Sequence, residues 1–249
     1  MRNYGGCMRP SFYSGWKHVF KLDPDRDIGD EALEAVCASG TDAILVGGSS
    51  GVTFDNTVEL MARIRRYEVP CAFELSDPAC GVPGFDGYFI PSVLNTKRAE
   101  WLIGHHAAAI REFGHLLPWD SIVGEAYLVL NPDATVAKLT EADADISPAE
   151  AVAFAQVADR LWNVPVLYVE YSGTFGDMEL LGTIRNTLHQ AHLFYGGGID
   201  GPDKAAQAAL RADTVVVGNI IYENLAAALA TVNAVNQAVK EQKDVLRKG

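Results

Sequence analysis

Eight short runs of β-branched and aromatic residues recur along this chain, with helix-like segments between most of them. Near-continuous apolar runs of this kind are typical of parallel strands that are buried on both faces. Strands that alternate with helices predict a parallel sheet, and eight such units can close into a (β/α)8 TIM barrel. The strands are expected at residues 18–22, 43–48, 71–75, 88–93, 125–130, 166–171, 193–198 and 214–219.

Helix-like patterns fill the gaps between these strands, with one exception. The segment SDPACGVPGFDG (76–87) follows the third strand, and its Gly and Pro residues prevent a regular helix. We therefore expect the helix after strand 3 to be replaced by an irregular segment, which leaves that side of the barrel less covered. Helices are expected at 29–40, 56–67, 97–113, 147–162, 177–188, 202–212 and 224–243, with Asp30, Asn56, Ser147 and Asp177 as capping residues.

The length of the chain favours a single domain. Its 249 residues match the typical size of one TIM barrel, and no linker or low-complexity tract divides them. We expect the barrel domain to span residues 16–249. Residues 1–15 lie outside the pattern and are expected to form an N-terminal extension that is a candidate for disorder.

Charge and composition exclude several classes of protein. The net charge of −12 argues against nucleic-acid binding, which needs a basic face. No apolar run is long enough to cross a bilayer, and the first residues lack the apolar core of a secretion signal. The four cysteines suggest no disulfide framework. A cytoplasmic protein without a transmembrane segment is therefore expected.

The last two strands end in glycine, in LFYGGGI (193–199) and TVVVGNI (214–220). Glycine allows positive φ angles and a close approach of a ligand to the backbone. Two such ends that open toward helix N-termini present backbone N–H groups that suit a phosphate. In TIM barrels a phosphate commonly binds after strands seven and eight. The sequence therefore predicts a phosphorylated small-molecule ligand.

The strand ends together resemble one family. The likeness runs from about residue 16 to about residue 235 without a large gap, and YVEYSG with FYGGGI is its most specific part. The chain resembles the PcrB-like group, the bacterial heptaprenylglyceryl phosphate synthases, which are relatives of the archaeal geranylgeranylglyceryl phosphate synthases. The segments that carry the resemblance are HVFKLDP (18–24), GTDAILVGGSSGVT (40–53), YFIPSVLN (88–95), LNPD (130–133), LTEADAD (139–145), YVEYSG (168–173), FYGGGI (194–199) and VVVGNIIYE (215–223).

This resemblance implies a prenyl transfer in a homodimeric enzyme. The 3-hydroxyl of sn-glycerol 1-phosphate would attack C1 of a long-chain prenyl diphosphate, heptaprenyl (C35) diphosphate, to give an ether lipid precursor and pyrophosphate, with Mg²⁺ supporting the leaving group. The matching positions imply that Asp23 and Ser49 bind the metal. They imply glycerol 1-phosphate binding by Lys21, Tyr168, Val169, Glu170, Tyr171, Ser172, Gly173, Gly198, Gly218 and Asn219.

The chemistry of the first strand end fits these roles. Lys21 and Asp23 are two residues apart, so their side chains point to the same side. Lys21 either meets an anion or is a surface residue. Mg²⁺ needs only one or two protein carboxylates beside phosphate oxygens, a role that suits Asp23. The alternative is that Asp23 is a cap or turn residue before Pro24. Family members often carry Asp where this chain has Ser50, a change that weakens metal binding or matters little.

Glu170 lies within an apolar strand, where a carboxylate needs a partner. It is the candidate general base that accepts the proton of the attacking hydroxyl, and the alternative is an ion pair with Lys21 or another strand-end group. Tyr168 has the same parity and either donates to phosphate or belongs to the core.

A long prenyl chain needs an apolar groove, which the less covered side between strands three and five offers. The resemblance implies that a small residue deep in this tunnel accompanies a C35 chain and an aromatic residue a C20 chain. Ala109, or its neighbour Ala108, is expected at that position in helix 97–113. The alternative is that an alanine-rich helix simply reflects helix propensity.

Two other functions stay open. A phosphate-binding TIM-barrel isomerase or lyase would share the glycine-ended strands, but residues 166–171 contain no lysine for a Schiff base. A non-catalytic barrel that binds a phosphate ligand without turnover is the second alternative, and Ser50 keeps it open.

Overall fold

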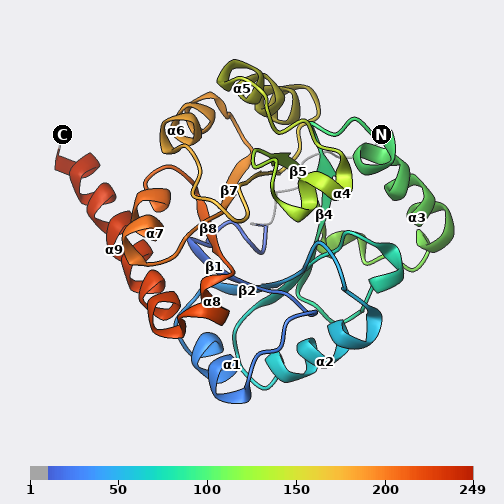
Figure 1. Cartoon of the computed structure of the whole chain (residues 1–249), viewed down its shortest axis with the longest axis horizontal. Helices are drawn as coiled ribbons and strands as arrows, with labels where there is room; N and C mark the ends of the chain where they lie inside the picture. The colour runs from blue at the N-terminus through green and yellow to red at the C-terminus, as the bar shows by residue number, and fades with distance from the viewer. Residues whose placement is uncertain (1–10, 249) are drawn as a thin grey trace, which may run out of the picture.

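The computed structural model describes residues 11–248 and shows a closed barrel of eight parallel strands in the order β1 to β8 (Figure 1). Each strand pairs with its sequence neighbours, and β8 closes the ring on β1. The TIM barrel predicted from the sequence is confirmed. The strands are β1 His18–Leu22, β2 Ala43–Val46, β3 Cys71–Glu74, β4 Gly87–Val93, β5 Ile122–Val129, β6 Val166–Glu170, β7 His192–Gly196 and β8 Thr214–Val217.

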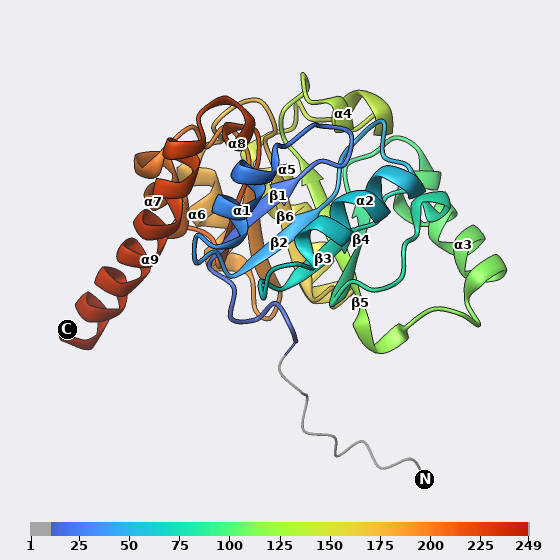
Figure 2. The same cartoon turned by 90° about the horizontal axis from the view of Figure 1, so that it is seen from below.

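Helices cover the outside of the barrel (Figure 1). The last of them, α9, packs along α7 and extends past the barrel in both views (Figures 1 and 2). No described helix combines the length and the hydropathy that a membrane crossing requires. The helices are α1 Asp30–Cys37, α2 Phe54–Ile64, α3 His105–Phe113, α4 Thr135–Thr140, α5 Pro148–Gln156, α6 Met178–Thr187, α7 Pro202–Ala209, α8 Ile220–Glu223 and α9 Leu225–Lys248.

Two of these helices, α4 and α8, were not expected from the sequence. Both are too short to show a helical period, with six and four residues. Both lie at the same end of the barrel, which faces upward in Figure 2. The predicted helices 97–113 and 147–162 are each divided, because the stretches Glu100–Gly104 and Val157–Leu161 adopt π-helical turns.

The predicted helix starts are right at two positions and wrong at two. Ser147 and Asp177 accept backbone N–H groups of α5 and α6. The cap of α2 is Thr53, and Asn56 is the third helical residue, whose side-chain oxygen accepts the Thr53 N–H. Asp30 lies inside the first turn of α1, where its charge favours the helix N-terminus without capping it.

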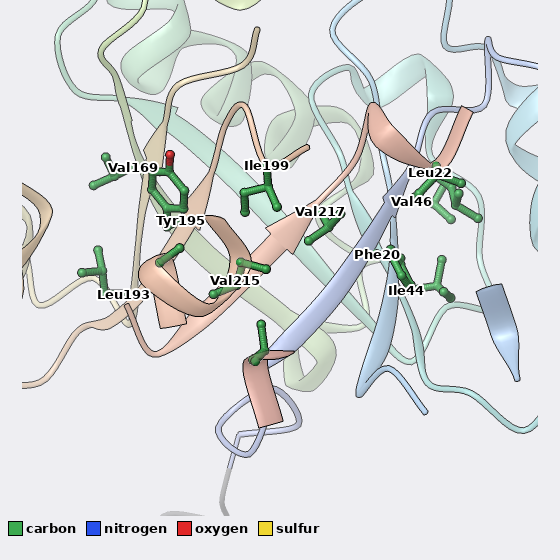
Figure 3. Close-up of a cluster of buried hydrophobic side chains, with 14 of the residues drawn as sticks. Phe20, Leu22, Ile44, Val46, Val169, Leu193, Tyr195, Ile199, Val215 and Val217 are labelled. Carbon is green, nitrogen blue, oxygen red and sulfur yellow. The ribbon is translucent and has the colours of Figure 1, made fainter. Parts of the chain in front are cut away.

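Alternation along each strand separates two apolar cores. Outward side chains pack between the barrel and its helices, and Figure 3 shows Phe20 and Leu22 of β1 beside Ile44 and Val46 of β2. Inward side chains fill the barrel itself, as layered TIM-barrel interiors require. The inward set includes Val19, Leu45, Ala72, Phe89, Tyr127, Tyr168, Phe194 and Val216.

Aromatic residues near the start of the described chain close the end of the barrel opposite α4 and α8. Tyr13 and Trp16 are buried, and their rings lie 5.5 and 6.1 Å from the ring of Phe89. Residues 11–15 of the predicted N-terminal extension are therefore packed against the barrel. Residues 1–10 of that extension lie outside the described residues.

The segment between β3 and β4 is irregular, as predicted, apart from one 3-10 turn at Pro78–Cys80. It nevertheless covers β3, because Phe85 stacks on Phe73 at a centroid distance of 5.0 Å and Val82 is buried with it. Apolar side chains thus replace part of the missing helix.

Candidate functional site

A cavity of about 520 Å³ opens at the carboxyl ends of the strands. Residues on or directly after β1, β2, β5, β6, β7 and β8 converge on it although they are far apart in the sequence. Of the residues expected from the sequence, the cavity brings together Lys21, Asp23, Ser49, Tyr168, Glu170, Ser172, Gly173, Gly198, Gly218 and Asn219.

Two expected residues contribute no side chain to this cavity. Val169 is completely buried on the outer face of β6. Tyr171 also packs outward, with its ring 6.3 Å from that of Tyr195. Because successive side chains of a strand point to opposite faces, Tyr168 and Glu170 of β6 face the cavity and Val169 between them does not.

The glycines after β7 allow two loops to touch. Gly198 has a φ of +55°, and a Cβ atom there would lie 2.1 Å from the Phe175 nitrogen and 2.2 Å from the Thr174 carbonyl carbon. The loop that follows β6 therefore rests directly on the glycine turn after β7. Only glycine fits this close approach in a left-handed conformation.

Lys21 lies inside the barrel top with a carboxylate beside it. Its Nζ donates to Glu74 Oε1 at 2.6 Å and lies 5.5 and 5.9 Å from the ring centroids of Tyr168 and Tyr127. Burial lowers the pKa of Lys21, but the carboxylates of Glu74 and Glu170 outweigh it, and the net pKa is raised. The direct partner is thus Glu74, whereas Glu170 acts on the ammonium through its charge.

Glu170 is 2% exposed and both its oxygens accept hydrogen bonds. The Tyr127 hydroxyl donates to Oε2 at 2.7 Å, and the Ser172 N–H donates to Oε1. Burial raises the pKa of Glu170, while Lys21 and the two donors lower it, so that the net pKa is above the usual value. A fixed carboxylate with a raised pKa is suited to accept a proton.

The residues expected to hold a metal line the same cavity. Asp23 is half-buried, its Oδ1 accepts the Asp25 N–H at 3.0 Å, and burial raises the pKa of its carboxyl. A Cβ atom at Gly48 would lie 2.4 Å from Asp23 Oδ1, so the carboxylate sits against the backbone just before Ser49. One carboxylate and one hydroxyl in an open cavity fit Mg²⁺, which keeps several waters and binds through substrate phosphates. The described residues contain no cluster of three His, Cys, Asp or Glu side chains that would form a complete metal cage.

Sequence reasoning missed several residues of this site. Arg26 lines the cavity, donates to Asn219 Oδ1 at 2.9 Å and lies 3.8 Å from the Tyr222 ring centroid. The Tyr222 hydroxyl in turn accepts the Asp23 N–H at 3.0 Å. These contacts join the loop after β1 to Asn219 and to Tyr222 of α8, nearly 200 residues away, so only barrel closure reveals them.

A second, smaller cavity of about 50 Å³ adjoins the first and shares Gly48, Ser49, Tyr127 and Val136 with it. Pro91, Val93, Trp101 and Leu139 give it apolar walls, and Glu74, Glu100, His105 and His106 give it polar ones. The expected tunnel residues do not line it. Ala109 is half-buried one helical turn beyond His105 and His106, and Ala108 is exposed.

Fold and site define a TIM barrel whose ligand cavity lies at the carboxyl ends of its strands. More closely, the chain belongs to the PcrB family, whose model matches residues 13–236. The chain is 54% identical over 222 residues to the heptaprenylglyceryl phosphate synthase of Bacillus thuringiensis (strain Al Hakam). The matched region covers 89% of this chain and 97% of that protein. The heptaprenylglyceryl phosphate synthase of Bacillus anthracis matches to the same extent, with the same coverage of both chains.

Solved structures share the fold. (S)-3-O-geranylgeranylglyceryl phosphate synthase from Thermoplasma acidophilum, in complex with the substrate sn-glycerol-1-phosphate, superposes with a TM-score of 0.80 at 23% identity, over 91% of this chain and 96% of that one. Wild-type GGGPS from Thermoplasma volcanium gives a TM-score of 0.76 at 23% identity, over 90% of this chain and 94% of that one. At these identities the likeness concerns the fold.

Proposed function

We propose that this protein is a prenyltransferase that moves a heptaprenyl group from its diphosphate to the 3-hydroxyl of sn-glycerol 1-phosphate. The products are an ether lipid precursor and pyrophosphate. Family membership and the 54% identical heptaprenylglyceryl phosphate synthases support this reaction. The structural observation that carries it is the buried Glu170 carboxylate, fixed by Tyr127 and Ser172 at the wall of a glycine-lined cavity.

The acceptor would lie between the glycine loops and β6. Gly198, Gly218 and Asn219 line the cavity, and backbone N–H groups of this region are proposed to bind the phosphate. Lys21 adds a positive charge from below. The glycerol hydroxyls would then lie toward Glu170. The synthase of Thermoplasma acidophilum, solved with sn-glycerol-1-phosphate, has the same fold, which supports an acceptor site of this kind.

Proton and bond changes then balance with groups of this chain. Glu170 accepts the proton of the 3-hydroxyl while the glycerol oxygen forms a bond to C1 of the prenyl chain. The bond between C1 and the diphosphate oxygen breaks, and pyrophosphate leaves with the bonding electrons. The Tyr127 hydroxyl and the Ser172 N–H hold Glu170 in place throughout.

Asp23 and Ser49 are proposed to hold Mg²⁺ beside the diphosphate. When bound, the ion supplies positive charge that neutralises the leaving pyrophosphate. Asp23 is the single carboxylate of this pair, and Ser50 and Arg26 line the same cavity.

The prenyl tail is proposed to leave the metal region through the second cavity and to run along α3 past Ala109. The two cavities meet at Gly48 and Ser49, so a diphosphate there can reach both. The homodimer and the cytoplasmic location stay predictions from the resemblance and the composition.

An assay with purified protein tests the proposal. Protein, MgCl₂, sn-glycerol 1-phosphate and heptaprenyl diphosphate should release pyrophosphate and form the prenyl ether, and the sn-glycerol 3-phosphate enantiomer serves as control. Removal of the metal with a chelator should stop the release. Calorimetric binding of sn-glycerol 1-phosphate without product from any C15 to C35 diphosphate would instead indicate the non-catalytic barrel.

A further inference from the structure

Two acidic residues that the proposed reaction does not use lie inside the barrel below the acceptor site. Interior layers of a TIM barrel take their side chains from alternate strands. Lys21 of β1, Glu74 of β3 and Glu125 of β5 point inward, because they share the parity of Val19, Ala72 and Tyr127 in the interior core. These three residues therefore converge from alternate strands around the barrel axis.

The fourth alternate strand contributes no side chain of its own at this height. β7 ends at Gly196, and a Cβ atom there would lie 2.0 Å from the Tyr168 hydroxyl oxygen. The phenol of Tyr168 thus occupies the space that a residue of β7 would fill. Tyr168 therefore closes the group around Lys21 on the side of β7.

Glu125 is the most isolated member of the group. Its exposed fraction is 0%, and no hydrogen-bond donor of the described residues reaches either of its carboxyl oxygens. Glu74 is 8% exposed; its Oε1 accepts from Lys21, but its buried Oε2 also has no donor among the described residues. Three buried carboxyl oxygens among the described residues therefore have no hydrogen-bond donor.

The charge balance indicates which of these carboxyl groups holds a proton. One ammonium, Lys21, faces three carboxyl groups, those of Glu74, Glu125 and Glu170. Glu170 has its own donors in Tyr127 and Ser172, and Glu74 has Lys21. Burial raises the pKa of Glu125 well above its usual value, the charges of Glu74 and Glu170 raise it further, and only Lys21 opposes them.

We propose that Glu125 is a neutral carboxylic acid whose proton is donated to Oε2 of Glu74, which makes Glu125 a positioning residue for Lys21. One proton then satisfies the free oxygen of Glu74 and leaves the Lys21–Glu74 pair electrically neutral. Oε1 of Glu74 stays aimed at the ammonium, and Lys21 keeps its remaining donors for an anion in the cavity above.

A charge on Glu125 would have the opposite effect. It would add a buried negative charge below a site for a phosphate dianion, and it would attract Lys21 away from that site. This consequence for binding rests on the proposed function, in which Lys21 meets the phosphate of glycerol 1-phosphate. The protonation of Glu125 itself does not depend on that function.

Infrared spectroscopy of the full chain at pH 8 tests the protonation directly. The wild-type minus Glu125→Gln difference spectrum should contain the carbonyl stretch of one protonated carboxyl group, shifted in D₂O. A difference spectrum with carboxylate bands in its place would overturn the proposal. If Glu125→Gln does not fold, wild-type protein with ¹³C-labelled glutamate decides, because the carbonyl band must then shift with the label, and its absence refutes the proposal.

Kinetics of two variants test the link to Lys21. In Glu125→Gln the amide can still donate to Glu74, so the KM for sn-glycerol 1-phosphate should stay near the wild-type value. In Glu125→Leu, of similar size, the donor is lost, and kcat/KM should fall by about tenfold or more, chiefly through KM.

Two kinetic results would overturn the proposal: a Gln variant that binds the phosphate markedly more tightly, which indicates an ionised Glu125, or a folded Leu variant that behaves like the Gln variant. Thermal unfolding of both variants controls for folding. Calorimetry of the wild-type protein separates the two proposals, because a failure to bind sn-glycerol 1-phosphate refutes the proposed function, and the infrared band then decides the state of Glu125 alone.

Discussion

Replacement of Gly198 by alanine tests whether the glycine turn after β7 shapes the acceptor site. The φ of +55° at this position costs an alanine about 1–2 kcal/mol, which lowers the Tm by about 2–4 °C for each kcal/mol. The new methyl group would also lie 2.1 Å from the Phe175 nitrogen and 2.2 Å from the Thr174 carbonyl carbon. Ordinary contact begins at 3.4 Å, so the backbone of the loop after β6 must move by more than an ångström.

That movement reaches the chemistry through Ser172, two residues earlier in the same loop, whose N–H holds Glu170. A displacement of about 1 Å at a reacting group can cost about 100-fold in rate. We therefore expect kcat/KM for sn-glycerol 1-phosphate to fall by about 100-fold, while the KM for heptaprenyl diphosphate changes much less. Steady-state kinetics with each substrate varied in turn measures both.

The matched control is Gly201→Ala, three residues further along the same loop. Gly201 has an extended backbone with a φ of 170°, and no atom lies within 4 Å of its added Cβ. Its variant should keep the wild-type kinetics and Tm. If Gly198→Ala leaves kcat/KM for sn-glycerol 1-phosphate unchanged, or if both variants lose activity equally, the argument from loop contact is wrong.

Three further predictions concern the base, the tunnel and the fold. Glu170→Gln should lower kcat by about 10²–10⁴-fold. Because burial raises the pKa of Glu170, the activity of the wild-type enzyme should fall on the acid side at a higher pH than an ordinary glutamate would give. The pH–rate profile of the variant should lack this acid limb. Ala109→Trp should reduce turnover of C35 more than of C20 diphosphate, whereas Ala108→Trp, at an exposed position, should not; equal effects would place the tunnel elsewhere. Burial lowers the pKa of His18 to about 3, so the unfolded chain alone takes up this proton as the pH falls from about 6.5 toward 3. The free energy of unfolding should then decrease by up to about 1.4 kcal/mol per pH unit through this residue, a slope that denaturant titrations should find reduced in His18→Gln.

The barrel was predictable because each strand is a short apolar run between turn residues. The expected ends overshoot where glycine follows: β2 stops at Val46 and β8 at Val217, although residues 43–48 and 214–219 were expected. At these points the chain leaves the ladder to line the cavity. The glycines at these strand ends line the site, and they also make the last residue of each strand hard to predict.

Side-chain partners were harder to predict than side-chain roles. Glu170 is visible in the sequence as a carboxylate in an apolar strand, and an ion pair with Lys21 is the natural guess from sequence alone. In the structure, Lys21 donates to Glu74 of β3, and Glu170 accepts from Tyr127 of β5. Both contacts depend on the stagger of the closed barrel, which sets the height at which each inward residue meets the others.

Glu125 illustrates the same point for function. In the sequence it is one acidic residue at the start of an expected strand, where solvent exposure would need no explanation. In the structure β5 begins three residues earlier, at Ile122, and Glu125 becomes a completely buried interior residue. A small error in a strand boundary thus hides a buried carboxyl group, and with it the charge balance below the acceptor site. One electrostatic unit is thus formed by four residues, Lys21, Glu74, Glu125 and Glu170. The protonation state of each depends on the charges of the others, which come from strands that are distant in the sequence.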